Sequence, residues 1–127
     1  MLLLAITFMF MQKTYTKHHP VPKLIPIQIE ETVLPAVGFT PAPALSDLTF
    51  YQGRAFPEWN GDALLGSLKA GTLYRVRVEN NEPTEVERLL VNFGRMRDVT
   101  IGPEGNVFIA VEHNENGSIW RLRPIAP

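Results

Sequence analysis

The chain has 127 residues, which is enough for one domain with its own core. Its net charge at pH 7 is −1 and its basic residues are spread along the sequence, which argues against electrostatic capture of nucleic acid. The sequence contains no cysteine, so disulfides and thiolate metal sites are excluded. Eleven prolines and nine glycines indicate many turns.

Residues 1–17 are interpreted as an apolar leader, either signal-like or non-native. The first eleven are uncharged and apolar, and Lys13 and Lys17 follow. This run is shorter than the roughly 20 residues that cross a bilayer, and it lacks the basic start and small-residue cleavage site of an export signal. An atypical signal, a weak anchor and a start codon placed ahead of the true coding segment all stay open.

Residues 18–45 are predicted to form a proline-rich extended linker. Six prolines fall in this segment, and proline blocks both helices and central strands. Two short stretches, 25–29 and 32–37, are candidates for edge strands. His18 and His19 point to opposite sides of an extended chain and have no third ligand nearby, so we predict surface histidines and no metal site.

From residue 46 onward, short β-strand patterns alternate with glycine turns. Residues 72–78 alternate between two faces, as strands do, and the links at 69–71 and 113–117 are predicted to be hairpin turns. The clearest predicted strands are 62–68, 72–78, 86–93, 106–111 and 118–123.

These strands repeat. Gly61 recurs 44 residues later as Gly105, and Gly71 recurs 46 residues later as Gly117. The segments that recur in the same order are Asp47–Phe50 as Asp98–Ile101, Gly61-Asp62 as Gly105-Asn106, and Gly71–Arg77 as Gly117–Arg123. A period near 44 residues with about four strands is typical of a propeller blade. Since propellers close with four to eight blades, we expect residues 46–127 to form about two blades of a larger ring.

Two motifs in this region are specific in combination: Ser67-Leu68-Lys69-x-Gly71 and Arg95-x-Arg97-Asp98-Val99. With them, residues 48–124 resemble the C-terminal end of the glucose/sorbosone dehydrogenase family. These proteins are six-bladed propellers that oxidise aldose sugars with pyrroloquinoline quinone (PQQ), usually in the bacterial periplasm. The resemblance implies an all-β propeller fragment of about two blades, a PQQ cofactor, an aldose substrate and a periplasmic or secreted location.

The resemblance also implies cofactor contacts for Lys69, Arg95 and Arg97. The two arginines are two residues apart, so in a strand they project from one face while Met96 projects from the other. Guanidinium groups bind carboxylates in forked pairs, PQQ carries carboxylates, and an ammonium group near a quinone oxygen stabilises developing negative charge. Asp98 is expected to brace one of the arginines. The competing interpretation is that these are ordinary exposed side chains.

The sequence also departs from the family pattern. Ala42 replaces a hydroxyl residue and Leu45 a proline near the cofactor, which removes a polar contact. The catalytic base and the calcium-binding loop of the family lie in earlier blades, and His18, His19 and His113 do not match the base motif, so no catalytic residue is assigned. We therefore expect a segment that is inactive without the missing blades. The alternative is a non-catalytic binding module that self-associates to close the ring. The terminal part of a propeller hydrolase has less support, because the spacing of acidic, amide and histidine residues shows no set of metal ligands.

Overall fold

The computed structural model describes residues 36–126, which belong to two compact units, Met1–Ala42 and Pro43–Pro127. The predicted leader, the two adjacent histidines, the stretch 25–29 and most of the stretch 32–37 lie outside the described residues. The described part of the predicted linker has no regular secondary structure before residue 45. Among residues 36–126, no helix is long and apolar enough to cross a membrane.

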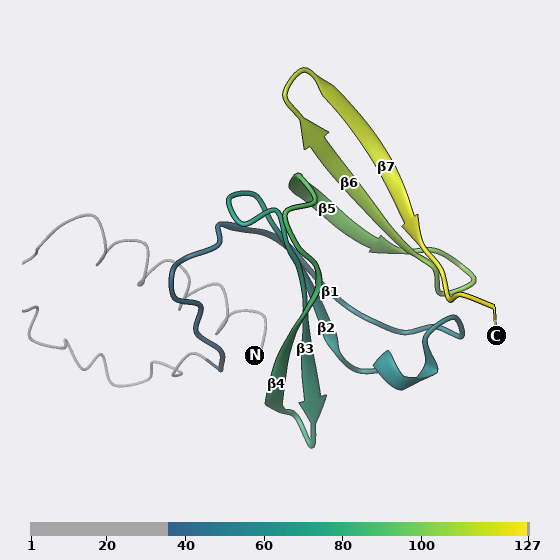
Figure 1. The fold of residues 1–127 in the computed structure, drawn as a ribbon. Coiled ribbons are helices and arrows are strands. Elements are labelled where there is room, and N and C mark those ends of the chain that lie inside the picture. Colours follow the sequence, from purple (N-terminus) through teal and green to yellow (C-terminus); the bar gives the residue numbers. More distant parts are fainter. Residues whose placement is uncertain (1–35, 127) are drawn as a thin grey trace, which may run out of the picture. The chain divides into compact units, whose positions relative to one another are not determined.

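The second unit consists of two antiparallel β-sheets (Figure 1). The first sheet has the strand order β1-β2-β3-β4, with a short 3-10 helix between β1 and β2, and the second has the order β5-β6-β7. The elements are β1 (Leu45–Phe50), η1 (Pro57–Trp59), β2 (Ala63–Ser67), β3 (Leu73–Glu79), β4 (Glu82–Leu90), β5 (Arg95–Ile101), β6 (Val107–His113) and β7 (Asn116–Leu122). The all-β prediction is confirmed. The expectation of two four-stranded sheets was wrong for the second, which has three strands within the described residues.

The clearest predicted strands did not include β1 and β5, and among those predicted the largest error is at β4, which begins at Glu82 rather than at residue 86. Asn80 and Asn81 have φ angles of 52° and 65°, the left-handed backbone that a tight two-residue hairpin requires. The turn therefore comes earlier and the strand is longer. The proline at the second position of β4 is tolerated because β4 is an edge strand.

The first strands of the two sheets share an irregularity. The register of β1 shifts between Leu45 and Asp47, and that of β5 shifts between Met96 and Asp98. Each strand thus carries one extra residue directly before its aspartate, as in a β-bulge. The internal repeat seen in the sequence therefore extends to the backbone geometry.

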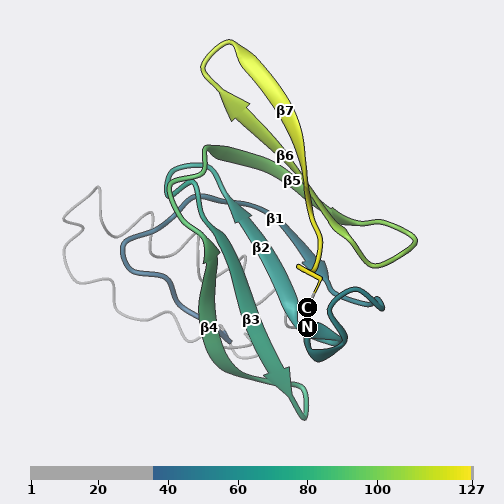
Figure 2. The ribbon, with the colours of Figure 1, turned by 45° about the vertical axis from the view of Figure 1, so that its right-hand side comes forward.

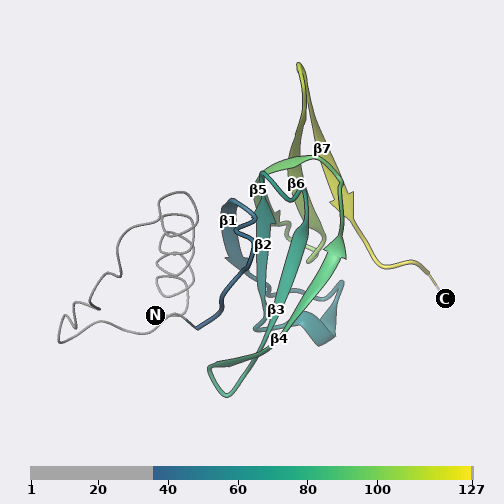
Figure 3. The same ribbon diagram turned by 60° about the vertical axis from the view of Figure 1, so that its left-hand side comes forward.

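The two sheets pack face to face through β5, which lies against β1 and β2 (Figure 2, Figure 3). Met96 and Val99 of β5 are 0% and 2% exposed. A Cβ atom built on Gly66 would lie 3.1 Å from Val99 Cγ2 and 3.3 Å from Met96 Cβ, so β2 has no side chain where β5 approaches. The Val99 backbone N–H also donates to Asp47 Oδ2 at 2.9 Å. The sheets are therefore separate layers, as neighbouring blades are.

A buried tyrosine joins the sheets at a second point. The Tyr51 hydroxyl donates to the Gly105 carbonyl at 2.7 Å and accepts from the Phe56 N–H at 3.0 Å. The ring meets Trp59 edge-on at a centroid distance of 5.8 Å. A Cβ on Gly53 would lie 2.5 Å from the Gly105 Cα, so the two loops touch through glycine backbone. These contacts fix the loop after β1 against the turn between β5 and β6.

Candidate cofactor site

Arg95 and Arg97 lie at the start of β5, on either side of a fully buried Met96. Their side chains are 53% and 50% exposed. Arg95 is the first residue of β5 to pair with β6, and Arg97 is the extra residue of the bulge. Both guanidinium groups reach the same carboxylate, as expected for two side chains that leave the strand on its accessible side.

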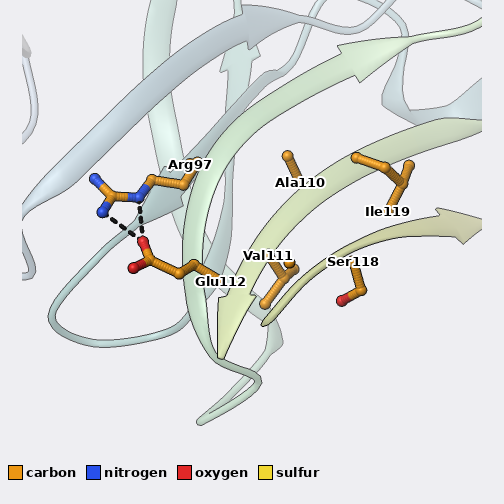
Figure 4. A pocket seen from close by; sticks show the side chains of 7 residues that line it. Arg97, Ala110, Val111, Glu112, Ser118 and Ile119 are labelled. Carbon is orange, nitrogen blue, oxygen red and sulfur yellow. Dashed lines mark hydrogen bonds and ion pairs between the residues drawn. The ribbon is translucent and has the colours of Figure 1, made fainter. Parts of the chain in front are cut away.

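That carboxylate is Glu112, which lies opposite Arg95 on β6. Arg97 Nε donates to Glu112 Oε2 at 2.6 Å and its Nη2 contacts the same oxygen (Figure 4). Arg95 Nε lies 3.8 Å from the same oxygen. The expectation that Asp98 braces an arginine is therefore wrong. Sequence reasoning missed Glu112, because its role depends on the register between β5 and β6.

Asp98 lies instead beside Asp47, the aspartate at the equivalent position of β1. Partial burial raises the pKa of Asp98, and the charge of Asp47 and a hydrogen bond with it raise that pKa further, against a smaller opposing effect of the Val99 N–H. The bulge explains the change of partner, because it aligns Asp98 with Ala110 rather than with Glu112 in the ladder. The two repeats thus bring their aspartates together where the sheets meet.

The third predicted cation, Lys69, is exposed on the link between β2 and β3. This link is held against the segment that leads into β5. The Phe93 N–H donates to the Gly71 carbonyl at 2.8 Å, and a Cβ on Gly71 would lie 3.0 Å from the Gly94 carbonyl oxygen. The structure therefore places the turn that carries Lys69 next to the residues that precede Arg95.

His113, which ends β6, also lies at this place. A Cβ on Gly94 would lie 2.5 Å from His113 Cε1 and 3.0 Å from its Nδ1, so the imidazole covers the glycine backbone. No group of three or more metal-ligating side chains occurs among residues 36–126. The region contains three cations, namely Lys69, Arg95 and Arg97, and one carboxylate that pairs with the arginines. Its donor set and excess positive charge fit a ligand that carries several carboxylates.

The architecture of two separate antiparallel sheets matches part of a propeller, and comparison with known proteins identifies its family. The model of the glucose/sorbosone dehydrogenase family matches residues 10–121, so the chain belongs to the glucose/sorbosone dehydrogenase family. A crystal structure of a glucose dehydrogenase matches with a TM-score of 0.74 and 26% identity, over 86% of this chain and 32% of that one. The apo-form of the soluble aldose sugar dehydrogenase from Escherichia coli matches with a TM-score of 0.64 and 28% identity, over 73% and 27% of the two chains.

Two curated relatives are similar in sequence. An uncharacterized protein of Synechocystis sp. is 36% identical over 93 residues, 72% of this chain and 22% of its own length. The aldose sugar dehydrogenase YliI of Escherichia coli is 30% identical over 94 residues, 73% of this chain and 25% of its own length. The chain thus spans about a quarter of the length of these relatives.

Proposed function

We propose that the chain is the C-terminal segment of a PQQ-dependent aldose dehydrogenase and that Lys69, Arg95 and Arg97 contact the cofactor. The observation that carries this proposal is the pair of half-exposed guanidinium groups on β5, held by one carboxylate beside the turn of Lys69. Family membership and the likeness to glucose and aldose sugar dehydrogenases support the assignment.

In this proposal, each basic residue has a separate part in binding. Arg97 is fixed by Glu112, so it presents its remaining N–H groups with little loss of side-chain freedom. Arg95, at 3.8 Å from the same carboxylate, is less constrained and supplies a second planar donor. Lys69 adds a compact cation from the adjoining turn. When bound, PQQ supplies the two-electron oxidation of the sugar.

We further propose that this chain alone does not turn over a sugar. Loss of hydride from a sugar carbon requires a base for the hydroxyl proton, and no residue here takes the family's base position. That base and the calcium-binding loop belong to the remaining blades, in keeping with a chain that matches about one quarter of the length of its curated relatives. An aldose is the proposed substrate of the complete propeller, and the periplasm is its proposed location.

Titration of the full chain with PQQ, followed by tryptophan fluorescence, tests the cofactor site. Loss of a charge-assisted contact of about 1.5–3 kcal/mol predicts that Arg97→Gln weakens binding about 10- to 100-fold. Arg77→Gln is the matched control, because Arg77 is a similarly exposed strand arginine paired with Glu85 at 3.1 Å in the other sheet. Equal loss in both variants, or wild-type affinity in Arg97→Gln, would contradict the assignment.

A turnover assay tests the requirement for the other blades. The full chain is incubated with PQQ, calcium, glucose and a reducible dye, and no dye reduction is expected. Turnover by the chain alone would refute the proposed inactivity without bearing on which residues bind the quinone.

A further inference from the structure

The sequence contains two Asn–Gly dipeptides, Asn60-Gly61 and Asn116-Gly117. In such a dipeptide the backbone nitrogen of the glycine can attack the side-chain Cγ of the asparagine, because glycine has no side chain to obstruct the approach and its backbone adopts many conformations. The attack requires an asparagine side chain that can turn and a glycine N–H that is not held by a hydrogen bond. The two dipeptides differ in both respects.

In the first dipeptide, both reacting groups are held. Asn60 Oδ1 accepts the Gly53 N–H at 2.8 Å. The Gly61 N–H donates to the carbonyl of the buried Tyr51 at 2.9 Å. Gly61 also has a φ angle of 91°, a conformation that residues with a side chain rarely adopt, so the loop itself requires this glycine. An attack by the Gly61 nitrogen can therefore occur only after the loop has opened locally.

The second dipeptide begins β7, next to the turn of the β6-β7 hairpin, which projects from the two sheets (Figure 1, Figure 2). Asn116 and Gly117 are both exposed, and the Asn116 side chain forms no hydrogen bond with another residue in the range 36–126. A Cβ atom built on Gly117 would come no closer than 3.9 Å to the Val111 carbonyl oxygen, so packing does not confine this part of the backbone. Hairpin ends of this kind open at little cost in free energy.

The pairing of β6 with β7 also leaves the Gly117 nitrogen free. His113 and Asn116 pair across a two-residue turn, so this closing pair exchanges the backbone hydrogen bonds. Hydrogen-bonded and non-hydrogen-bonded pairs alternate, so in the next pair, Glu112 and Gly117, the glycine N–H points away from β6. Among the described strands, β7 is the last of its sheet, and none accepts that N–H. The β3-β4 hairpin has the same geometry, and there the equivalent position is Pro83, which has no N–H.

We propose that Asn116 is a site of spontaneous deamidation and that the fold protects Asn60 from the same reaction. The Gly117 backbone nitrogen forms a bond to Asn116 Cγ, the bond from Cγ to the side-chain nitrogen breaks, and that nitrogen leaves as ammonia with the proton of the Gly117 amide. Water then opens the resulting succinimide at either of its carbonyl carbons. The product has aspartate or isoaspartate at position 116, and the reaction needs no oxidant or cofactor.

Either product adds a negative charge at the border of the basic region. Asn116 is the cross-strand neighbour of His113, whose imidazole covers Gly94 beside the turn that carries Lys69. Isoaspartate also lengthens the backbone between the last two pairs of the hairpin, the second of which contains Glu112. We therefore expect deamidation to weaken the binding of PQQ, a consequence that rests on the proposed cofactor role.

Peptide mapping by mass spectrometry, without PQQ, tests the modification site. The full chain is incubated at mildly alkaline pH, and the conversion of amide to acid is followed at both asparagines. Two hydrogen bonds protect Asn60 and Gly61, so we expect Asn116 to react about tenfold faster than Asn60, or more. In urea the two rates should become similar. Equal rates in the folded chain, or a difference in rate that persists in urea, overturns the proposal.

Gly117→Ala is a variant that tests the attacking nitrogen. The added methyl group has space, so the urea midpoint of unfolding should stay the same or rise. The methyl group obstructs ring closure, so the rate at Asn116 should fall severalfold while the rate at Asn60 is unchanged. An unchanged rate at Asn116 overturns the proposed attack.

Asn116→Asp tests the consequence for the basic region, because it reproduces the added charge. PQQ should bind this variant about two- to fivefold more weakly than the wild type. Asn81→Asp is the matched control and should keep wild-type affinity, because it adds the same charge to the exposed turn of the β3-β4 hairpin. Equal affinities of the two variants would refute this consequence. Failure of the wild type to bind PQQ would refute the cofactor role and this consequence with it, whereas the deamidation rates decide the modification site by themselves.

Discussion

Arg75 offers a direct test of how burial sets the strength of an ion pair, since two carboxylates of different exposure hold its guanidinium. Its Nε donates to Asp62 Oδ2 at 2.7 Å, and these side chains are 6% and 5% exposed. Its Nη1 donates to Glu87 Oε2 at 2.9 Å, but the Glu87 side chain is 49% exposed. Asp62→Asn and Glu87→Gln therefore remove the same charge from the same cation in two environments.

The two substitutions are expected to differ by about 2 kcal/mol or more. Removing one partner of a buried pair typically costs about 3–5 kcal/mol, because a charge stays buried without compensation. Glu87 and the ring of Trp59, 5.4 Å from the guanidinium carbon, retain part of the stabilisation, so about 2–4 kcal/mol is expected for Asp62→Asn. Loss of the exposed partner in Glu87→Gln should cost less than about 1 kcal/mol.

Equilibrium unfolding in urea, followed by circular dichroism and tryptophan fluorescence, measures both free energies of unfolding. The asparagine retains an oxygen that can accept the Val78 N–H, which Asp62 Oδ1 accepts at 3.0 Å, so the comparison isolates charge from backbone pairing. Equal losses for the two variants, or a larger loss for Glu87→Gln, would refute the reasoning that burial decides the strength of these pairs.

Two other predictions concern the junction between the sheets. Tyr51→Phe leaves the Gly105 carbonyl without its buried donor and should lower the free energy of unfolding by about 1–3 kcal/mol in urea, whereas a loss below about 0.5 kcal/mol would contradict this role. Burial and the Asp47 carboxylate raise the pKa of Asp98 above its ordinary value of 3.8, so the stability that its protonated form contributes is lost as pH rises through the folded pKa. Asp98→Asn should therefore have a higher urea midpoint of unfolding than the wild type at pH 7, and this difference in midpoint should shrink towards pH 4. A difference in midpoint that does not depend on pH would argue against the coupling.

Local sequence patterns were sufficient for four of the seven strands and for the repeat. Alternation of apolar residues and the recurring glycine turns predicted β2, β3, β6 and β7 to within a few residues. Alternation also placed Arg95 and Arg97 on the accessible side of β5, with Met96 buried between them. These features depend on neighbours along the chain, which is why they can be read from the sequence.

The start of β4 and the number of strands in the second sheet were not recovered. The Asn80-Asn81 pair was the available signal for the start of β4, since both residues tolerate the left-handed backbone of a tight hairpin. The number of strands in the second sheet depends on how far regular pairing continues after β7, and no local sequence pattern specifies this.

The identity of the bracing carboxylate was decided by the tertiary structure alone. Sequence proximity favoured Asp98, but the bulge in β5 aligns Asp98 with Ala110 and leaves Glu112 opposite Arg95. A shift of one residue in a β-ladder changes which side chains meet, and the sequence of one strand does not fix its register against another. The sequence by itself thus determined the repeat, most of the strands and the positions of the basic residues along the chain. Only the tertiary structure decided the rest: the packing of the two sheets brings the aspartates of the repeat together, and the register between β5 and β6 places Glu112 beside the arginines.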